Sequence, residues 1–138
     1  MKKRWIFCLL TLLLLLTACG RGVVEGADID LGTSAVYADN DLQTAVDTVM
    51  RKFLTWDGCE LYSLTYAGDV VSTQELAYCN SLRKAEQPLY AQCVVFESEF
   101  RSPRVASGGW EADTLYTWRF YLARTEGGAW QLVTWGYG

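Results

Sequence analysis

The side chains that could do chemistry in this sequence are thiols, carboxylates and aromatic rings, because its 138 residues include no histidine. Without histidine the chain has no Ser-His-Asp triad, no Cys-His pair and no imidazole ligand for a metal. Glu97 and Glu99 alternate with apolar residues in one segment, and Arg119 does so in a later one. On a sheet face that lines a pocket, such an acid could act as a general base, whereas Glu–Arg pairing across two strands would be purely structural.

Aromatic rings are the second candidate for a site. Residues 19–138 contain seventeen of them, and one sheet face cannot easily bury so many large side chains. Rings left exposed would form a patch that binds a sugar, a peptide or a partner protein. The residues expected at this pocket or patch are Tyr66, Trp110, Trp118, Arg119 and Trp135.

Two further groups of charged residues are explained more simply as solvated loop residues. Asp28 and Asp30 lack the third acid and the distal glutamate that a calcium loop requires. Arg101 and Arg104 flank a Ser-Pro pair and could bind a phosphate or carboxylate, but basic residues in loops are usually just hydrated. We therefore expect neither a metal nor another cofactor.

Cys19 ends a short N-terminal segment that has the layout of an export signal. Residues 2–4 are basic, residues 5–16 are apolar, and about a dozen apolar residues are too few to cross a bilayer, which takes roughly 20. The segment closes with Leu-Thr-Ala-Cys, which resembles the lipobox of a bacterial lipoprotein. We expect residues 1–18 to be a signal peptide and the Cys19 thiol to accept diacylglycerol before cleavage. The alternative is an ordinary secretory signal with an incidental cysteine.

The chain that remains after such a cleavage is acidic. Residues 19–138 carry nine Lys and Arg against sixteen Asp and Glu, a net charge of −7. This charge disfavours nucleic acid and anionic lipid as partners. The prediction is a protein held on the cell membrane by the lipid on Cys19 and facing outside the cytoplasm, with residues 19–28 as tether and 29–138 as a single domain.

Periodicity predicts an α+β fold for this domain. Apolar residues recur at helical spacing over 40–55, where Asn40 and Gln43 suggest an N-cap, and Ser72 and Glu75 suggest a capping box that opens a shorter helix to residue 82. Short connections favour an antiparallel arrangement of the strands. We expect a long N-terminal helix and a shorter second helix packed on a four-stranded antiparallel sheet, with strands over 59–67, 89–101, 111–124 and 129–137.

The sequence also resembles a family of small Gram-positive bacterial lipoproteins. The motifs that carry the resemblance follow the lipobox and are Trp-Asp-Gly-Cys-Glu-Leu from residue 56, Leu-Thr-Tyr from 64, Val-Val-Phe-Glu-Ser from 94, Tyr-Thr-Trp-Arg-Phe-Tyr-Leu-Ala-Arg from 116, and Gly-Gly-Ala-Trp-Gln-Leu-Val-Thr-Trp-Gly-Tyr from 127. The resemblance covers roughly residues 29–138. It implies a curved, cone-shaped domain of the nuclear-transport-factor-two-like (cystatin-like) kind, and it implies no catalytic residues.

Three cysteines are left in the domain once Cys19 carries lipid. Cys59 opens a predicted strand, whereas Cys79 lies inside the second predicted helix, and the different rises of strand and helix keep these two apart. Cys79 and Cys93 lie near one connection, so their Cα atoms could approach within the about 7 Å that a disulfide allows. Two interpretations remain open: a Cys79–Cys93 disulfide with Cys59 reduced, or three buried thiols.

These observations favour a non-catalytic binding or envelope-assembly module on the cell surface, whose ligand would be a cell-wall component, sugar, peptide or protein. The alternative is a small-molecule enzyme that uses the pocket of the cone fold. A deep cavity with converging polar side chains would favour the enzyme, and a shallow groove would favour the binding module.

Overall fold

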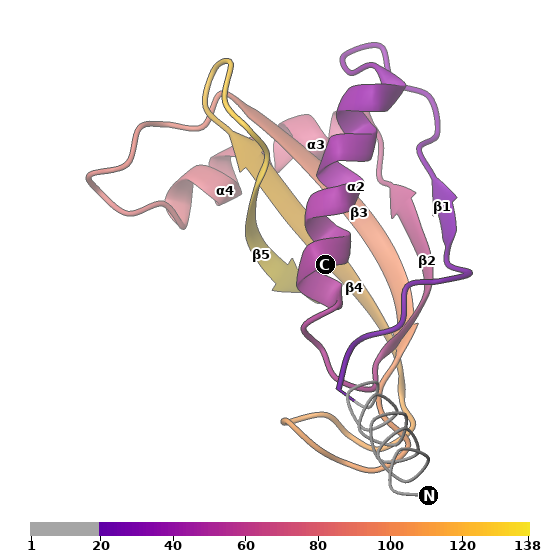
Figure 1. Cartoon of the computed structure of the whole chain (residues 1–138). Coiled ribbons are helices and arrows are strands. Elements are labelled where there is room, and N and C mark those ends of the chain that lie inside the picture. Colours follow the sequence, from indigo (N-terminus) through magenta and orange to yellow (C-terminus); the bar gives the residue numbers. More distant parts are fainter. Residues whose placement is uncertain (1–19) are drawn as a thin grey trace, which may run out of the picture.

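The computed structural model describes residues 20–138, so the predicted signal peptide and Cys19 lie outside the described residues. Three helices and five strands follow one another along this described part of the chain (Figure 1). In order they are β1 (Asp28–Asp30), α2 (Asp39–Phe53), β2 (Glu60–Tyr66), α3 (Asp69–Gln74), α4 (Leu76–Ser81), β3 (Gln92–Arg101), β4 (Leu115–Arg124) and β5 (Gln131–Gly136).

The five strands form one mixed sheet in the order β1-β2-β3-β4-β5. The pairs β2–β3, β3–β4 and β4–β5 are antiparallel, whereas β1 runs parallel to β2. A parallel pair needs a crossover connection, and α2 supplies it, because the helix lies between β1 and β2 in the chain.

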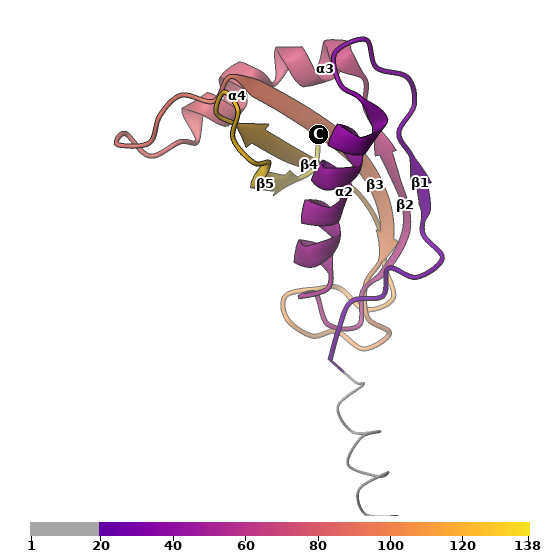
Figure 2. The same cartoon turned by 45° about the horizontal axis from the view of Figure 1, so that its top comes forward.

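Helix α2 packs along one face of the sheet, which curves around it (Figure 2). Its buried residues recur every three or four positions, so they form one apolar stripe. They contact a core contributed by β2, β3 and β4, in which Phe96, Phe100 and Phe120 are fully buried. The stripe, which the sequence pattern over 40–55 predicts, comprises Leu42, Ala45, Val46, Val49 and Phe53.

Helices α3 and α4 cover part of the opposite face, which we call the outer face. Alternate residues of a strand point to opposite sides, so Cys93 and Val95 of β3 lie beneath these helices while Val94 and Phe96 lie beneath α2. Ser72 fixes α3 to the sheet, because its Oγ accepts a hydrogen bond from the backbone N–H of Val95 (3.1 Å). The domain therefore has two small cores, one on each side of the sheet.

The predicted cone-shaped, cystatin-like fold, with a long N-terminal helix and a shorter second helix on a four-stranded antiparallel sheet, is wrong in its sheet and in its helices. The sheet has five strands and is mixed, and the longest helix within residues 20–138 has 15 residues. The second helix is two helices of six residues that meet at Glu75. The capping box expected at Ser72 and Glu75 is also wrong, because Ser72 lies inside α3 and bonds to β3. The N-cap expected at Asn40 is wrong as well, because Ala38 is the residue that precedes α2.

Backbone hydrogen bonds hold residues 21–23, part of the predicted tether, against the domain. The N–H of Gly22 donates to Leu54 (3.1 Å), and Val23 exchanges two hydrogen bonds with the start of β2, to Cys59 (2.8 Å) and from Leu61 (2.9 Å). Within residues 20–138 no helix is long and apolar enough to cross a membrane.

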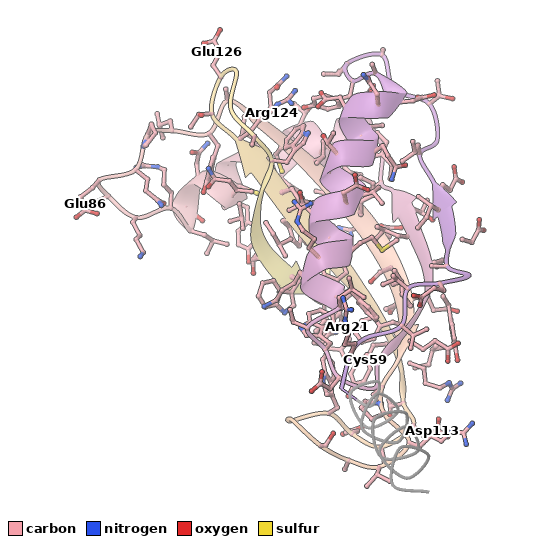
Figure 3. All side chains as sticks on the ribbon, in the orientation of Figure 1. Arg21, Cys59, Glu86, Asp113, Arg124 and Glu126 are labelled. Atoms are coloured by element: carbon pink, nitrogen blue, oxygen red, sulfur yellow. The ribbon has the colours of Figure 1, made fainter. Side chains whose placement is uncertain are left out.

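An ion pair joins the first turn of α2 to the end of β4. Arg124 donates from Nη1 and Nη2 to the two carboxylate oxygens of Asp41, both at 2.8 Å, and Trp130 Nε1 donates to the same carboxylate (3.0 Å). The guanidinium lies 4.0 Å from the centroid of the Trp130 ring. Figure 3 shows Arg124 beside the start of α2. Because the pair is bidentate and mostly shielded, it ties the helix to the β4–β5 hairpin more strongly than an exposed pair would.

Replacing Asp41 with asparagine is expected to lower stability by about 1–3 kcal/mol, between the values for exposed and buried pairs. The hydrogen bonds from Arg124 hold the pKa of Asp41 below its usual range. A lowered pKa gives stability that is present above the unfolded-state pKa of about 3.9 and is lost as pH falls through the folded-state value. Urea unfolding at several pH values should therefore show a smaller loss of stability below pH 4 in the variant.

Asp47→Asn is the matched control, because Asp47 lies on the same helix and, among residues 20–138, its carboxylate is bound only by the Gln43 amide (3.1 Å). This control should keep the acid dependence of the parent chain. An Asp41→Asn variant with unchanged stability at neutral pH would contradict the role assigned to the pair.

Candidate functional site

The outer face of the sheet changes from apolar to polar where α3 and α4 stop covering it. On β3, Cys93 and Val95 lie under these helices, and the next residues on the same face are Glu97 and Glu99. On β4, Ala123 and Tyr121 are likewise followed toward the strand start by Arg119 and Thr117. The strand period of two thus places a set of charged and hydroxyl side chains on an uncovered surface.

Strand register arranges these side chains in two rows across β2, β3 and β4. In one row Thr65 lies opposite Glu97, and Glu97 lies opposite Arg119. The second row consists of Ser63, Glu99 and Thr117. Side chains directly opposite each other on neighbouring strands lie about 5 Å apart, so a ligand could touch several of them at once.

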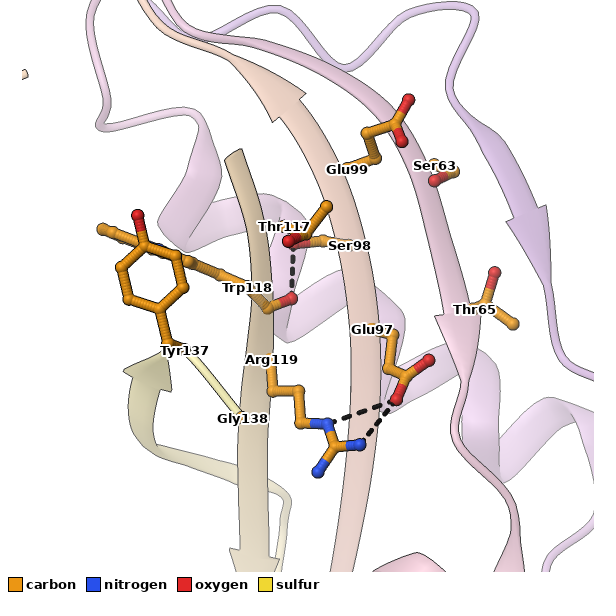
Figure 4. A pocket seen from close by; sticks show the side chains of 10 residues that line it. All are labelled: Ser63, Thr65, Glu97, Ser98, Glu99, Thr117, Trp118, Arg119, Tyr137 and Gly138. Carbon is orange, nitrogen blue, oxygen red and sulfur yellow. Dashed lines mark hydrogen bonds and ion pairs between the residues drawn. The ribbon is translucent and has the colours of Figure 1, made fainter. Parts of the chain in front are cut away.

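The Glu97–Arg119 pair leaves polar atoms available for a ligand. Arg119 donates from Nε (3.2 Å) and from Nη2 (2.8 Å) to the same oxygen, Oε1 of Glu97, and these contacts raise the pKa of Arg119 (Figure 4). No contact within residues 20–138 uses the second oxygen, Oε2, and none uses the Glu99 carboxylate. The carboxylates of Glu97 and Glu99 can therefore accept hydrogen bonds from a ligand, and the Arg119 guanidinium can donate to it.

These rows form the floor of an open groove of roughly 500 Å³, a volume within the range of small-molecule sites. Tyr137 and Trp118 lie at its β4 side, with ring centroids 5.8 Å apart and planes at 77° (Figure 4). The Tyr137 side chain is 73% exposed and presents a ring to solvent. The groove thus combines carboxylates, hydroxyls and an aromatic edge, and its two carboxylates outnumber its single guanidinium.

Three of the five residues predicted for the patch come together around the ring of Trp56, and one of them, Trp118, also lines the groove. Trp110, Trp118 and Trp135 have ring centroids 5.4, 5.9 and 6.0 Å from that of Trp56. The rings of Phe53, Phe100 and Phe120 also contact the ring of Trp56. Most of this cluster therefore closes the core at the C-terminal end of α2. Trp135 is its more exposed member, and Lys52 Nζ lies 4.4 Å from the centroid of its ring.

The other two predicted residues lie away from this cluster. Tyr66 is buried, its hydroxyl donates to Asp69 (2.8 Å), and burial raises its pKa to about 12. Arg119 lies on the outer face, because it follows Trp118 in the same strand and the two side chains point to opposite sides. Of the predicted set, only Trp118 and Arg119 line the groove.

The groove residues that the prediction missed are Ser63, Thr65, Ser98, Thr117, Tyr137 and Gly138. Ser63, Thr65 and Thr117 carry a readable signal, since each is a polar residue between two apolar neighbours in its strand. Tyr137 has no such signal, because it follows the last residue of β5 and belongs to no strand pattern. The fold of the chain after β5 brings its ring against that of Trp118.

Two of the other candidates, Arg101 and Asp30, have local partners. Arg101 donates to the side chain and backbone of Asp113 and, from Nε, to the Tyr62 hydroxyl (3.1 Å), so its guanidinium is engaged within the domain. Asp30 accepts a hydrogen bond from the N–H of Gly32 (2.8 Å), a local turn contact. In the described part of the chain, no three acids or cysteines gather closely enough to hold a metal ion.

Cys79 and Cys93 lie in contact, with Sγ atoms 3.3 Å apart, and both are free thiols in the structure, as is Cys59. The structure therefore brings the predicted pair together without joining it. Cys59 lies in the core on the other side of the sheet.

Comparison with known proteins adds no family to these observations. No family model matches the chain, and neither a curated protein nor a solved structure matches it.

Proposed function

We propose that the chain is a membrane-anchored lipoprotein that works outside the cytoplasm as a non-catalytic binding module. The observation that carries the binding role is the groove on the outer face, where Glu97, Glu99 and Arg119 lie beside the exposed ring of Tyr137. Its openness to solvent favours binding over catalysis, because small-molecule enzyme sites are usually enclosed pockets that bury most of the substrate. The anchoring role rests on the lipobox-like sequence before Cys19.

The chemistry of the groove favours a neutral ligand rich in hydroxyl groups, such as a short cell-wall saccharide. Two carboxylates and one guanidinium give the groove a net negative charge, which disfavours phosphates and other anions. Carboxylates and hydroxyls can bind sugar hydroxyls, and the ring of Tyr137 can pack against the apolar C–H face of a sugar ring. The acidic charge of the whole domain adds to the discrimination against anions.

Removing the Glu99 carboxylate is expected to weaken saccharide binding about tenfold, the value of one hydrogen bond to a charged group. The probe is a tetramer of N-acetylglucosamine, titrated into the full chain in detergent and followed by calorimetry. The Glu99→Ala variant should keep its stability, because no contact within the described residues depends on this carboxylate. Tyr137→Ala should weaken binding by a similar factor through loss of the stacking ring.

Glu86→Ala is the matched control. Glu86 is an exposed glutamate on the loop after α4 (Figure 3) and is not among the residues that line the groove, so its removal should leave binding unchanged. Equal affinity of Glu99→Ala and the parent chain, or binding of a lysine-rich peptide in preference to the tetramer, would count against the saccharide proposal.

A further inference from the structure

The contact between Cys79 and Cys93 is fixed from several directions by the fold. Cys79 lies on α4 with no exposed surface, and Cys93 lies on β3 with 2% exposed. The neighbouring side chain of Asn80 makes two hydrogen bonds with the backbone of Tyr90, donating to its carbonyl (3.1 Å) and accepting from its N–H (2.9 Å). On the α3 side, Ser72 binds the backbone of Val95. These bonds hold α4 against the start of β3 and keep the two thiols together.

We propose that Cys79 and Cys93 form the disulfide of this domain and that Cys59 stays a thiol. Closing the Sγ–Sγ separation from 3.3 Å to the bonded distance of about 2.05 Å needs only a small movement of two side chains. Cys59 cannot take part, because it lies in the core under α2 on the opposite side of the sheet from Cys79 and Cys93. An exported protein meets the oxidising conditions in which such bonds persist.

The bond forms by thiol–disulfide exchange with a disulfide oxidant, either a small molecule or an oxidoreductase. The thiolate of one cysteine attacks a sulfur of the oxidant, forms a mixed disulfide and releases the first oxidant thiol. The thiolate of the other cysteine then attacks the mixed disulfide and releases the second thiol, so two protein thiols are oxidised and one disulfide is reduced.

Burial sets when this exchange can happen. Both sulfurs are shielded from solvent once α4 lies on the sheet, so an oxidant reaches them before α4 docks or when it opens. The closed loop of about 15 residues includes the exposed turn after α4. We expect reduction to lower Tm by roughly 10 °C, from the loop-closure estimate and the scaling for a domain of this size. We also expect a reductant to act much more slowly on the folded protein than in denaturant.

Mass spectrometry of the refolded chain tests the proposal. The full chain is reduced and unfolded, refolded in a glutathione redox buffer with detergent, and its remaining thiols are blocked with N-ethylmaleimide. Trypsin alone leaves Cys59 and Cys79 in one peptide, so a glutamate-specific protease is added to cut after Glu60 and Glu75. The three cysteines then lie in separate peptides, 53–60, 76–83 and 87–97.

The expected result is a disulfide between peptides 76–83 and 87–97, with the maleimide on peptide 53–60. A Cys59→Ser variant should form the same bond, which keeps the test independent of any effect of Cys59 on folding. A crosslink that contains Cys59, or three blocked thiols in the refolded chain, would overturn the proposal.

Discussion

Replacing Phe53 with alanine is expected to destabilise the domain by about 3–5 kcal/mol, the usual cost of truncating a fully buried aromatic side chain. Phe53 is the last residue of α2 and has no exposed surface. The centroid of its ring lies 5.2 Å from that of Trp56 and 5.5 Å from that of Phe100. Loss of the ring therefore opens a cavity where the end of α2, the following turn and β3 meet. Urea unfolding of the parent and variant chains, followed by tryptophan fluorescence, measures the difference.

Tyr137→Ala is the control for this measurement, because it also deletes an aromatic ring but at a position 73% exposed. Its expected effect is small, about 0.5 kcal/mol or less, as for other surface substitutions. A loss below about 1 kcal/mol for Phe53→Ala would show that the end of α2 does not pack on the sheet as the structure describes.

Strong periodicity made α2 and four of the strands predictable, and its absence explains what was missed. Strand β1 has three residues, and only the central Ile29 packs against the core, so its sequence looks like an acidic loop. It becomes a strand by pairing with β2, an interaction between distant segments. The break between α3 and α4 was also hidden, because helical residues continue on both sides of Glu75 and the change of direction follows the sheet beneath.

The candidate site was predictable in its residue types but not in its location. The sequence shows that Trp118 and Arg119 are adjacent, and strand geometry then requires their side chains to point to opposite faces. A patch containing both side chains could therefore form only at an edge of the sheet. Both line the groove, where the ring of Trp118 contacts the ring of Tyr137. Trp56 was overlooked as the centre of the aromatic cluster, because it follows a helix and belongs to no periodic pattern.

The sequence also did not reveal that the outer face is divided into a covered apolar half and an uncovered polar half. The change from apolar to polar between Val95 and Glu97 is visible in the sequence. Its meaning depends on where α3 and α4 lie, since these helices cover the apolar half and leave Glu97 and Glu99 uncovered. Which acids could meet a ligand therefore followed from the packing of helices on the sheet and not from strand periodicity alone.

Replacing Cys19 with alanine is expected to abolish lipid modification of the chain completely. The thiol is the only group at this position that can form the thioether to diacylglycerol, and alanine has none. Each buried acyl methylene contributes about 0.8 kcal/mol, and two acyl chains suffice for stable anchoring where one is marginal. The acidic domain offers no electrostatic attraction to anionic lipid in its place. The measurement is the mass of the N-terminal peptide and the incorporation of a labelled fatty acid in cells that express the full chain.

Cys8→Ala is the matched control, since Cys8 lies in the same N-terminal segment but outside the Leu-Thr-Ala-Cys sequence. It should keep both the label and the lipid mass. The covalent lipid is the decisive measurement rather than the membrane fraction, because an uncleaved apolar segment can itself hold a chain at the membrane. A Cys19→Ala chain that still incorporates fatty acid would contradict lipid anchoring at this residue. Equal loss of label in both variants would show that the apolar segment, and not the thiol of Cys19, determines the modification.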